Sequence, residues 1–566
     1  MQIWRVDLQN QTLQQSLVPP AWNRLGGRGL SARILLDEID PACDPLSPGN
    51  ALVFSPGLLV GHMLSSCDRI SIGGKSPLTQ GIKESNAGGT TGLHLARLGI
   101  KALILKNHAK SGWWILHLSI NGVRFDHADE IVGMGAYQSA QWLIEHYGSQ
   151  NAMALIGPGG ERQLRSAGIL NLDQEGSPTR ISARGGLGAV MGAMRLKAIV
   201  IDSQGGKKPD LVDEQAFRKA QKAFVEALIA HPQTAIYRDY GTAGVAAMCN
   251  AFGALPTRGF SAGQFENIDL IDGDHLRTTL QERGGEAQTT HACMPGCVIR
   301  CSNVFADPDG KAVVSPLEYE TIGLMGSNLG IESLDIIARL NWLVNDLGLD
   351  SIDIGAALGV AARAGLMRFG DGDSALKLMD EVFQGTALGN AIGNGAAATG
   401  EYLGIEEVPA VKGQAISAYD PRAVKGTGVT YATSPQGADH TAGLTLRAKV
   451  DHLDPHVQVE VSRNAQINMA GYDTLGACIF AGFGFASAPS ALRDLLNARY
   501  GWSVEENILQ QLGRETLRLE LEFNRQAGFA PTDDRMPQWL RRTPLPPTAA
   551  VFDVSDQDLD SVFASF

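Results

Sequence analysis

The sequence predicts an α+β protein with a β-sheet-rich N-terminal domain followed by two mainly α-helical domains. Up to about residue 205, short apolar runs end at Gly, Pro or Ser, which is the pattern of strands. Beyond that point, apolar residues recur at the spacing of amphipathic helices. We therefore expect three domains, over 1–205, 206–412 and 413–566.

Strands and one hairpin are predicted for the first domain. Residues 114–120 alternate apolar and polar side chains, turn at Asn121-Gly122 and return through 123–125. Asn-Gly between two alternating segments is a strong hairpin signal. The other predicted strands are apolar runs at 51–54, 70–72, 101–105 and 198–201.

Helices are predicted after a Gly- and Lys-containing linker at 203–209. Asp213-Glu214 has the acidic character of a helix start, and the helix should run through Leu228. The tail after Pro531 is rich in proline and acidic residues, so we expect it on the surface. Further predicted helices are a pair over 333–344 and 352–367 and a long amphipathic helix over 504–526.

Composition excludes some classes of function. The 566 residues carry 47 basic and 60 acidic side chains, a net charge of -13, which argues against nucleic acid and anionic membranes as partners. No stretch is long and apolar enough to span a bilayer, and the first residues lack the pattern of a signal peptide. Seven cysteines do not suggest a disulfide framework. We therefore expect a cytoplasmic protein.

Four cysteines are the most informative feature. Cys293, Cys297 and Cys301 form a C-x3-C-x3-C run, and Cys478 lies far downstream. Three close thiolates and a distant one suit a [4Fe-4S] cluster, which needs one ligand per iron. Zinc also binds four cysteines, although structural zinc sites usually contain C-x2-C pairs. Burial as small apolar side chains is the third possibility, and spacing alone leaves all three open.

Glycine-rich loops in the first domain indicate a large phosphate-bearing ligand. Backbone N–H groups together with arginine and lysine form phosphate cradles. No loop contains the Gly-Lys-Ser/Thr of a P-loop or the dinucleotide fingerprint, and each alone is more typical of a turn. Four such segments occur, at 25–30, 68–79, 85–90 and 182–189.

Taken in order, these motifs resemble those of the tungsten-containing aldehyde:ferredoxin oxidoreductases over almost the whole chain. The matching segments are Gly26–Leu30, Lys75–Thr79, Ser85–Gly89, Ala183–Gly192, Glu318–Thr321, Ala418–Arg422, Asp473–Cys478 and Phe523–Gly528. The resemblance implies that the N-terminal domain binds two pyranopterins, whose dithiolene sulfurs hold one tungsten without any protein ligand. It also implies magnesium between the pterin phosphates, bound by the backbone oxygens of Asn86 and Ala183, which suits a hard cation.

The resemblance assigns further residues to the cofactors. It implies two pterin-binding motifs, at 345–350 and 473–478, and the second ends in Cys478, the implied fourth cluster ligand. One short segment would then contact both a pterin and the cluster. The cofactor-binding residues expected on this basis are Arg69, Asn86, Gly88, Gly89, Ala183, Arg184, Gly185, Asp346, Asp350, Asp473 and Gly476.

The resemblance also implies the active-site residues. Glu320 matches a glutamate beside the metal and is the expected general base. His440 matches a histidine that contacts the oxo ligand or the substrate oxygen. The neighbouring Asp439 is as well explained as a structural partner of His440 as by a part in the reaction. Tyr319 and Tyr431 are candidate hydrogen-bond donors to the carbonyl oxygen.

Three departures from the family pattern stand out. The cysteine run has one more residue than the usual C-x2-C-x3-C, and Asn345 replaces an aspartate at the start of the first pterin motif. Glu332 is followed by Asp335 instead of the histidine of a Glu-x-x-His motif. We therefore expect no mononuclear iron shared between subunits, although an oligomer remains possible.

The expected function is oxidation of a small aldehyde to a carboxylate with water. Two electrons would pass through the [4Fe-4S] cluster to ferredoxin or to an iron–sulfur partner subunit. Reduction of a carboxylic acid or an aromatic thioester on the same scaffold is the alternative, because function lies in the site and not in the fold. A non-catalytic electron-transfer subunit is a further one. The sequence identifies neither the aldehyde nor the choice of tungsten over molybdenum.

Overall fold

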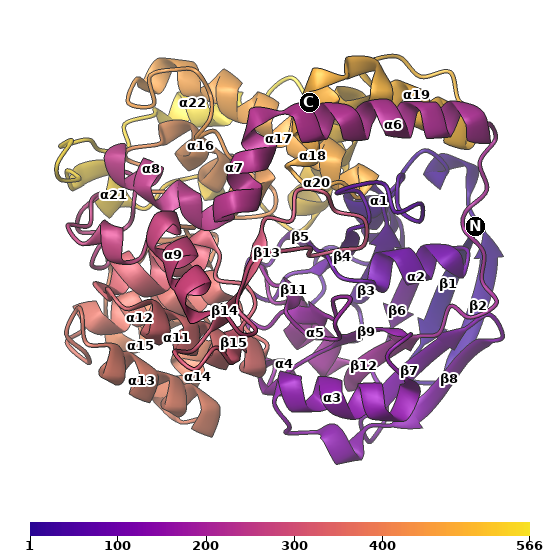
Figure 1. Cartoon of the computed structure of the whole chain (residues 1–566), viewed down its shortest axis with the longest axis horizontal. Helices are drawn as coiled ribbons and strands as arrows, with labels where there is room; N and C mark the ends of the chain where they lie inside the picture. The colour runs from indigo at the N-terminus through magenta and orange to yellow at the C-terminus, as the bar shows by residue number, and fades with distance from the viewer.

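Two six-stranded sheets form the N-terminal part of the protein in the computed structural model, which describes all 566 residues (Figure 1). The first sheet has the order β2-β1-β6-β3-β4-β5 and the second β11-β10-β9-β12-β7-β8. The pairs β1–β6 and β7–β12 are parallel, and the other pairs are antiparallel. The strands are β1 (Gln2–Asp7), β2 (Thr12–Leu17), β3 (Ala51–Pro56), β4 (Ile70–Lys75), β5 (Ile82–Ala87), β6 (Ile100–Lys106), β7 (Trp114–Ser119), β8 (Gly122–His127), β9 (Ala152–Leu155), β10 (Ile169–Asn171), β11 (Arg180–Ser182) and β12 (Leu196–Ile201).

The two sheets share an apolar core. Phe54 and Leu103 of the first sheet belong to the same buried cluster as Leu116 and Ile199 of the second. Two further clusters cover the remaining faces, one with helix α1 and one with helix α3. The hairpin predicted at Asn121-Gly122 is confirmed as β7–β8.

Helices make up most of the chain after residue 213, as predicted. Asp213 caps the first of them, since its carboxylate accepts the Ala216 N–H at 2.9 Å. The helices are α1 (Gly27–Glu38), α2 (Thr91–Arg97), α3 (Ala136–Tyr147), α4 (Pro158–Glu161), α5 (Leu187–Ala193), α6 (Glu214–Ala230), α7 (Pro232–Tyr240), α8 (Val245–Ala251), α9 (Gly273–Arg283), α10 (Tyr319–Thr321), α11 (Leu334–Leu347), α12 (Ser351–Arg363), α13 (Gly372–Gln384), α14 (Ala387–Gly393), α15 (Ala396–Leu403), α16 (Lys425–Thr433), α17 (Gln458–Leu475), α18 (Ala481–Ser487), α19 (Pro489–Tyr500), α20 (Ile508–Gln526), α21 (Gln538–Arg542) and α22 (Asp556–Ser561).

The helical regions share one large apolar core, which also includes residues of the N-terminal part such as Leu58, Leu164 and Ala189. A small sheet of β13 (Gln288–His291), β14 (Ser302–Ala306) and β15 (Ala312–Val314) lies near the centre of the molecule, beside the cysteine run (Figure 1). This sheet was not predicted from the sequence. The remaining strands, β16 (Ala410–Val411) and β17 (Gln414–Ala415), pair with each other.

Three predicted segments differ in the structure. Helix α20 begins at Ile508 instead of Val504, because the Val504 N–H is taken by the Asn497 side chain. Helix α12 ends at Arg363, before Gly365, which adopts a φ of 81°. The tail after Pro531 does not simply lie on the surface, because Phe552 and Val562 are fully buried in the helical core.

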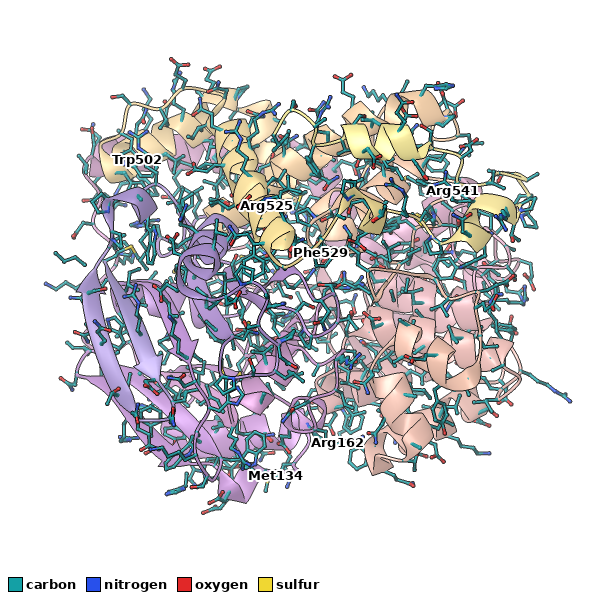
Figure 2. The ribbon with its side chains drawn as sticks, turned by 180° about the vertical axis from the view of Figure 1, so that it is seen from behind. Met134, Arg162, Trp502, Arg525, Phe529 and Arg541 are labelled. Atoms are coloured by element: carbon teal, nitrogen blue, oxygen red, sulfur yellow. The ribbon has the colours of Figure 1, made fainter.

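Polar contacts add to the apolar packing where the sheets meet the helices. Arg162, labelled between the two parts in Figure 2, donates from Nη1 to the backbone oxygen of Val382 at 2.6 Å. Its other amino group contacts the Asn390 side chain. Among the helices of the structure, none combines the length and apolar character needed to cross a bilayer.

Candidate functional site

A cavity of about 430 Å³ lies where the sheets meet the helices. Strands β5 and β11 contribute one side of its wall, and helices α10, α12 and α17 contribute to the other. The predicted site residues that line it are Arg69, Asn86, Gly88, Ala183, Arg184, Cys293, Cys301, Glu320, Asp350, His440, Asp473 and Cys478. Segments that are far apart in the sequence therefore meet in one space.

Glu320 and His440 face each other in this cavity. His440 Nε2 lies 3.3 Å from Glu320 Oε1, while the Ala418 N–H donates to Glu320 Oε2 at 2.8 Å. Ser417 Oγ lies 3.0 Å from His440 Nδ1 and fixes the other side of the ring. Glu320 lies in α10, directly before a π-helical turn over Ile322–Gly326, and such turns are frequent at functional sites. Burial raises the pKa of Glu320, and the positive charge of His440 opposes the rise.

Asp439 supports the histidine from the neighbouring position. Burial alone raises the pKa of Asp439, but the charges of Lys83 and Arg184 outweigh it and hold the pKa far below its usual range. Lys83 Nζ lies 2.7 Å from Asp439 Oδ2, and both side chains are buried. Asp439 Oδ1 accepts the Thr441 N–H at 3.0 Å, which fixes the turn that carries His440. Lys83 was not among the residues predicted from the sequence, because an isolated lysine in a strand gives no signal.

The four predicted cluster cysteines lie together. All four are half-buried and free of disulfides. Burial raises the pKa of the Cys301 thiol, and the three other thiols raise it further. No three of the four sulfurs lie within 4.8 Å of one another. Zinc–sulfur bonds of about 2.3 Å would place the sulfurs about 3.8 Å apart, so the arrangement is wider than a tetrahedral zinc site.

The glycines of one loop support the cysteine run. The Gly89 N–H donates to the Cys293 oxygen at 2.7 Å. A Cβ on Gly88 would lie 2.6 Å from that same oxygen, so a larger residue would displace the run. Gly89 contacts the backbone of the cysteine run and does not line the cavity. Gly185 is also outside the lining, and its backbone packs against the Lys83 side chain.

Two arginines hold the cavity loops. Arg69 donates from Nη2 to the backbone oxygen of Asn86 at 3.1 Å and also contacts its side-chain oxygen. Arg184 Nε lies 3.1 Å from Asp350 Oδ2, and Arg184 Nη1 donates to Ser417 Oγ at 2.9 Å. Arg69 therefore stays at the first sheet, whereas Arg184 connects the loop after β11 to the start of α12 and to Ser417.

The two predicted pterin motifs are placed differently. Asp350 caps α12 and lines the cavity, whereas Asp346 points away and accepts the Tyr137 N–H at 3.2 Å. Asp473 lines the cavity and lies 3.1 Å from Arg28 Nη1. Gly476 ends α17 with a φ of 74° and lies outside the cavity lining.

The segment from Asp473 to Cys478 is fastened to the N-terminal part by its backbone. The Leu58 N–H donates to the Thr474 oxygen at 3.1 Å, and the Cys478 N–H donates to the Ser66 oxygen at 2.7 Å. A Cβ on Gly57 would lie 2.0 Å from the Gly476 nitrogen, so only glycine fits this approach.

The two candidate tyrosines donate to the backbone. The Tyr319 hydroxyl donates to the Ala418 oxygen, and the Tyr431 hydroxyl lies 3.5 Å from the Tyr419 oxygen. Tyr319 lines the cavity, whereas Tyr431 does not. Tyr319 therefore faces the cavity beside Glu320, whereas Tyr431 lies behind the lining.

A buried charge network behind the cavity was not predicted. Arg28 Nε lies 2.7 Å from Glu520 Oε1, and both side chains are almost fully buried. Glu84 lines the cavity, and its Oε1 is buried without a hydrogen-bond partner. Burial and the nearby Asp473 raise the pKa of Glu84, against the charge of Arg28.

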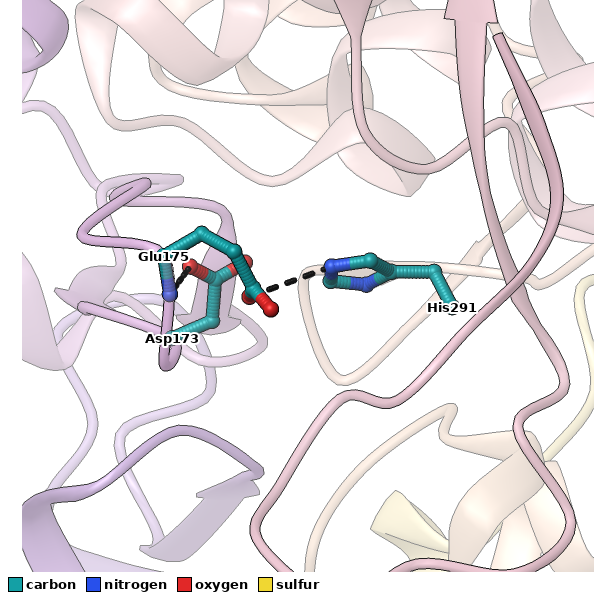
Figure 3. A group of neighbouring side chains, drawn as sticks. All are labelled: Asp173, Glu175 and His291. Carbon is teal, nitrogen blue, oxygen red and sulfur yellow. Dashed lines mark hydrogen bonds and ion pairs between the residues drawn. The ribbon is translucent and has the colours of Figure 1, made fainter. Parts of the chain in front are cut away.

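A second polar group lies beside the cysteine run. Figure 3 shows Glu175 reaching toward His291, whose Nε2 is 3.1 Å from Glu175 Oε2, with Asp173 alongside. These three residues have the ligand types of a metal site, with the ligand atoms within 4.8 Å. However, Arg180 Nη2 lies 2.8 Å from His291 Nδ1 and 3.4 Å from Asp173 Oδ2. The guanidinium already supplies the positive charge, so the group is an ion-pair network.

Comparison with known proteins places this geometry in a family. The model of the "Aldehyde ferredoxin oxidoreductase, N-terminal domain" matches residues 3–203, and the model of "Aldehyde ferredoxin oxidoreductase, domains 2 & 3" matches residues 219–565. A tungsten-containing aldehyde ferredoxin oxidoreductase of Pyrococcus abyssi is 30% identical, over 96% of this chain and 92% of that protein.

More distant similarities concern other reactions. A Pyrococcus furiosus protein described as the WOR-like subunit of an aliphatic sulfonate oxidoreductase is 28% identical, over 75% of this chain and 72% of that protein. The BamBC active-site complex of benzoyl coenzyme A reductase, solved with 1,5-dienoyl-CoA, superposes with a TM-score of 0.77 at 17% identity. It covers 95% of this chain and 90% of that chain, which shows a shared fold.

Proposed function

The chain belongs to the aldehyde ferredoxin oxidoreductase family, and we propose that it oxidises an aldehyde to a carboxylate with water. The two electrons would leave through a [4Fe-4S] cluster to a ferredoxin or to an iron–sulfur partner subunit. The observation that carries this proposal is the Glu320–His440 pair, which faces a cavity lined by three of the four clustered cysteines.

The polar groups that line the cavity are of the kinds that a tungsten bis-pyranopterin would need as partners. Buried polar atoms of two lining residues, Glu84 Oε1 and Arg180 Nε, have no hydrogen-bond partner within the protein. Such atoms are rare in native proteins unless a ligand or water satisfies them. Arg69 and Arg184 would hold the phosphates, and the backbone oxygens of Asn86 and Ala183 would bind magnesium. Asp350, Asp473 and the backbone at Gly88 would surround the pterins, and Gly89, Gly185 and Gly476 would support the loops from outside the cavity lining, whereas Asp346 points elsewhere.

The cysteine spacing supports a cluster over zinc. Cys293, Cys297, Cys301 and Cys478 are too widely spaced for one tetrahedral zinc ion. A cubane with one thiolate on each iron needs a wider set of sulfurs, so a [4Fe-4S] cluster is the group that we propose here.

In this proposal, Glu320 and His440 handle the protons of the reaction. The reaction converts an aldehyde and water into a carboxylate, three protons and two electrons, and the bound tungsten group supplies the acceptor for those electrons. Glu320 would take a proton from the attacking water, because burial raises its pKa toward the range in which a general base is effective. His440 would direct Nε2 toward the substrate oxygen, while Ser417 and Asp439 hold the ring and its turn.

The proposal is tested on protein purified without oxygen. Tungsten and iron are counted by mass spectrometry, and reduction of methyl viologen is followed with a series of aldehydes. Tungsten, about four irons per chain and aldehyde-dependent reduction would support the proposal. Zinc in place of iron would contradict the cluster, and iron without tungsten would indicate an electron-transfer subunit. A fully loaded protein that oxidises no aldehyde would contradict the activity.

A further inference from the structure

Arg447 differs from the other arginines that line the cavity. Arg69, Arg180 and Arg184 are engaged by side-chain and backbone oxygens around the cavity. Arg447 is exposed and pairs with no carboxylate, and its side chain makes one hydrogen bond, from Nη2 to the Tyr237 hydroxyl at 2.8 Å. Its positive charge therefore remains free to interact with a ligand at the edge of the cavity.

The Arg447 guanidinium rests on a rigid aromatic support. Its central carbon lies 5.3 Å from the centre of the Tyr237 ring, within the range of a cation–π contact. Tyr237 is only 5% exposed and packs against Phe480, with ring centres 4.2 Å apart. Both aromatic residues also line the cavity. The hydrogen bond and the ring together hold the guanidinium in place before any ligand binds.

The chain between His440 and Arg447 contributes polar, apolar and cationic side chains to the cavity lining. His440 and Thr441 are polar, Leu444 and Leu446 are apolar, and Arg447 is cationic, and all of them line the same cavity. An aldehyde whose carbonyl lies at the Glu320–His440 pair would have its carbon chain against the leucines. An aldehyde long enough to extend from this pair to Arg447 would place its far end at the guanidinium.

We infer that the substrate is a small aldehyde with an anionic group at the end remote from the carbonyl, and that Arg447 binds this group. The inference rests on the proposed aldehyde oxidation. A guanidinium offers paired N–H donors that match the oxygens of a carboxylate, sulfonate or phosphate. Because Arg447 would contact the non-reacting end of the substrate, it is a binding residue, and its loss should raise KM more than it lowers kcat.

The inference is tested by comparing pairs of aldehydes, one anionic and one neutral, as substrates. The assay uses the anaerobic holoenzyme with methyl viologen as the electron acceptor. The pairs are succinic semialdehyde with butanal, sulfoacetaldehyde with propanal, and glyceraldehyde 3-phosphate with glyceraldehyde. At least one anionic aldehyde should exceed its neutral partner about 10-fold in kcat/KM, and the preferred pair identifies the anionic group. Arg447→Gln should reduce kcat/KM for that anionic aldehyde about 10- to 100-fold and change the neutral one less than about 2-fold.

Tyr237→Phe is the conservative companion variant. It retains the ring beneath the guanidinium and removes only the hydroxyl, so the loss should be about 3-fold and confined to the anionic aldehyde. Binding of the carboxylate product of the preferred aldehyde, measured by calorimetry, gives a readout without turnover. That binding should weaken in Arg447→Gln.

The outcomes separate this inference from the proposed function. Neutral aldehydes oxidised as well as anionic ones, or an Arg447→Gln variant that slows both equally, would overturn the inference and leave aldehyde oxidation standing. Oxidation of none of the six aldehydes by tungsten-loaded protein would overturn both.

Discussion

His440 Nε2 lies 3.3 Å from Glu320 Oε1 across the cavity. The two residues come from different parts of the helical region, one from α10 and one from the turn after α16. Each is also fixed from its other side, Glu320 by the Ala418 N–H and His440 by the Ser417 hydroxyl. Both side chains are therefore held in place, which is the preorganisation that the proposed acid–base roles would require.

The first prediction concerns the pH dependence of turnover. Burial raises the pKa of Glu320 above the ordinary value of 4.5, so its basic form appears only as pH rises through that higher pKa. Activity should therefore fall on the acidic side with a midpoint above that of an ordinary glutamate. Glu320→Gln should lower kcat about 10²- to 10⁴-fold. The exposed Glu332→Gln serves as the control, and an acidic limb that survives in Glu320→Gln would contradict the role.

The second prediction concerns iron content. Cys478→Ser should lose most of the iron, because a cubane needs a thiolate at each corner. Cys43→Ser is the matched control, since Cys43 is also half-buried but has no other cysteine close to it. Iron would be counted in both variants after anaerobic purification. Equal iron in the two variants would exclude Cys478 as a ligand.

The third prediction concerns the buried Lys83–Asp439 pair. Lys83→Met leaves the Asp439 carboxylate buried without its partner, which should destabilise the protein by about 3–5 kcal/mol. Because the native pKa of Asp439 is depressed, the stability from this pair is present above pH 3.8 and is lost as pH falls through the native pKa.

Denaturant unfolding of Lys83→Met should therefore show its deficit at neutral pH. The double variant Lys83→Met/Asp439→Asn should recover part of the loss, because it removes the unpaired charge. A double variant less stable than Lys83→Met would contradict this explanation.

The fourth prediction concerns the C-terminal tail. Phe552 is fully buried, so Phe552→Ala should cost about 3–5 kcal/mol of unfolding free energy. The exposed Gln557 lies in the same tail, and Gln557→Ala should change stability by less than about 0.5 kcal/mol. Denaturant midpoints for both variants check the prediction. Equal stability of the two variants would mean that the tail does not pack as described.

Local signals predicted the elements that local interactions determine. The β7–β8 hairpin follows from the turn at Asn121-Gly122, and α6 begins after the Asp213 cap. Signals of this kind act over a few residues, so they are visible in a single sequence. The tail was misjudged for the opposite reason, because Phe552 is buried against helices that lie far away in the sequence.

Motifs in the sequence identified the candidate site residues, but they did not predict which of these residues face the cavity. Asp346 and Asp350 belong to one short motif, yet α11 ends between them and only Asp350 lines the cavity. Residues that act through distant partners carried no signal at all. Lys83 meets Asp439, and Tyr237 meets Arg447, only after segments far apart in the sequence have come together.

The buried contact of Arg28 with Glu520 and Asp473 has a consequence for the ancestry of the chain. Its guanidinium and both carboxylates are almost completely enclosed, and they come from opposite ends of the protein. A gene exchange that replaced only one half would strand a charge in an apolar interior, at a cost of several kcal/mol. Exchange of one half alone is therefore expected to fail, and variation at position 28 is expected to be limited by residues encoded near the other end of the gene.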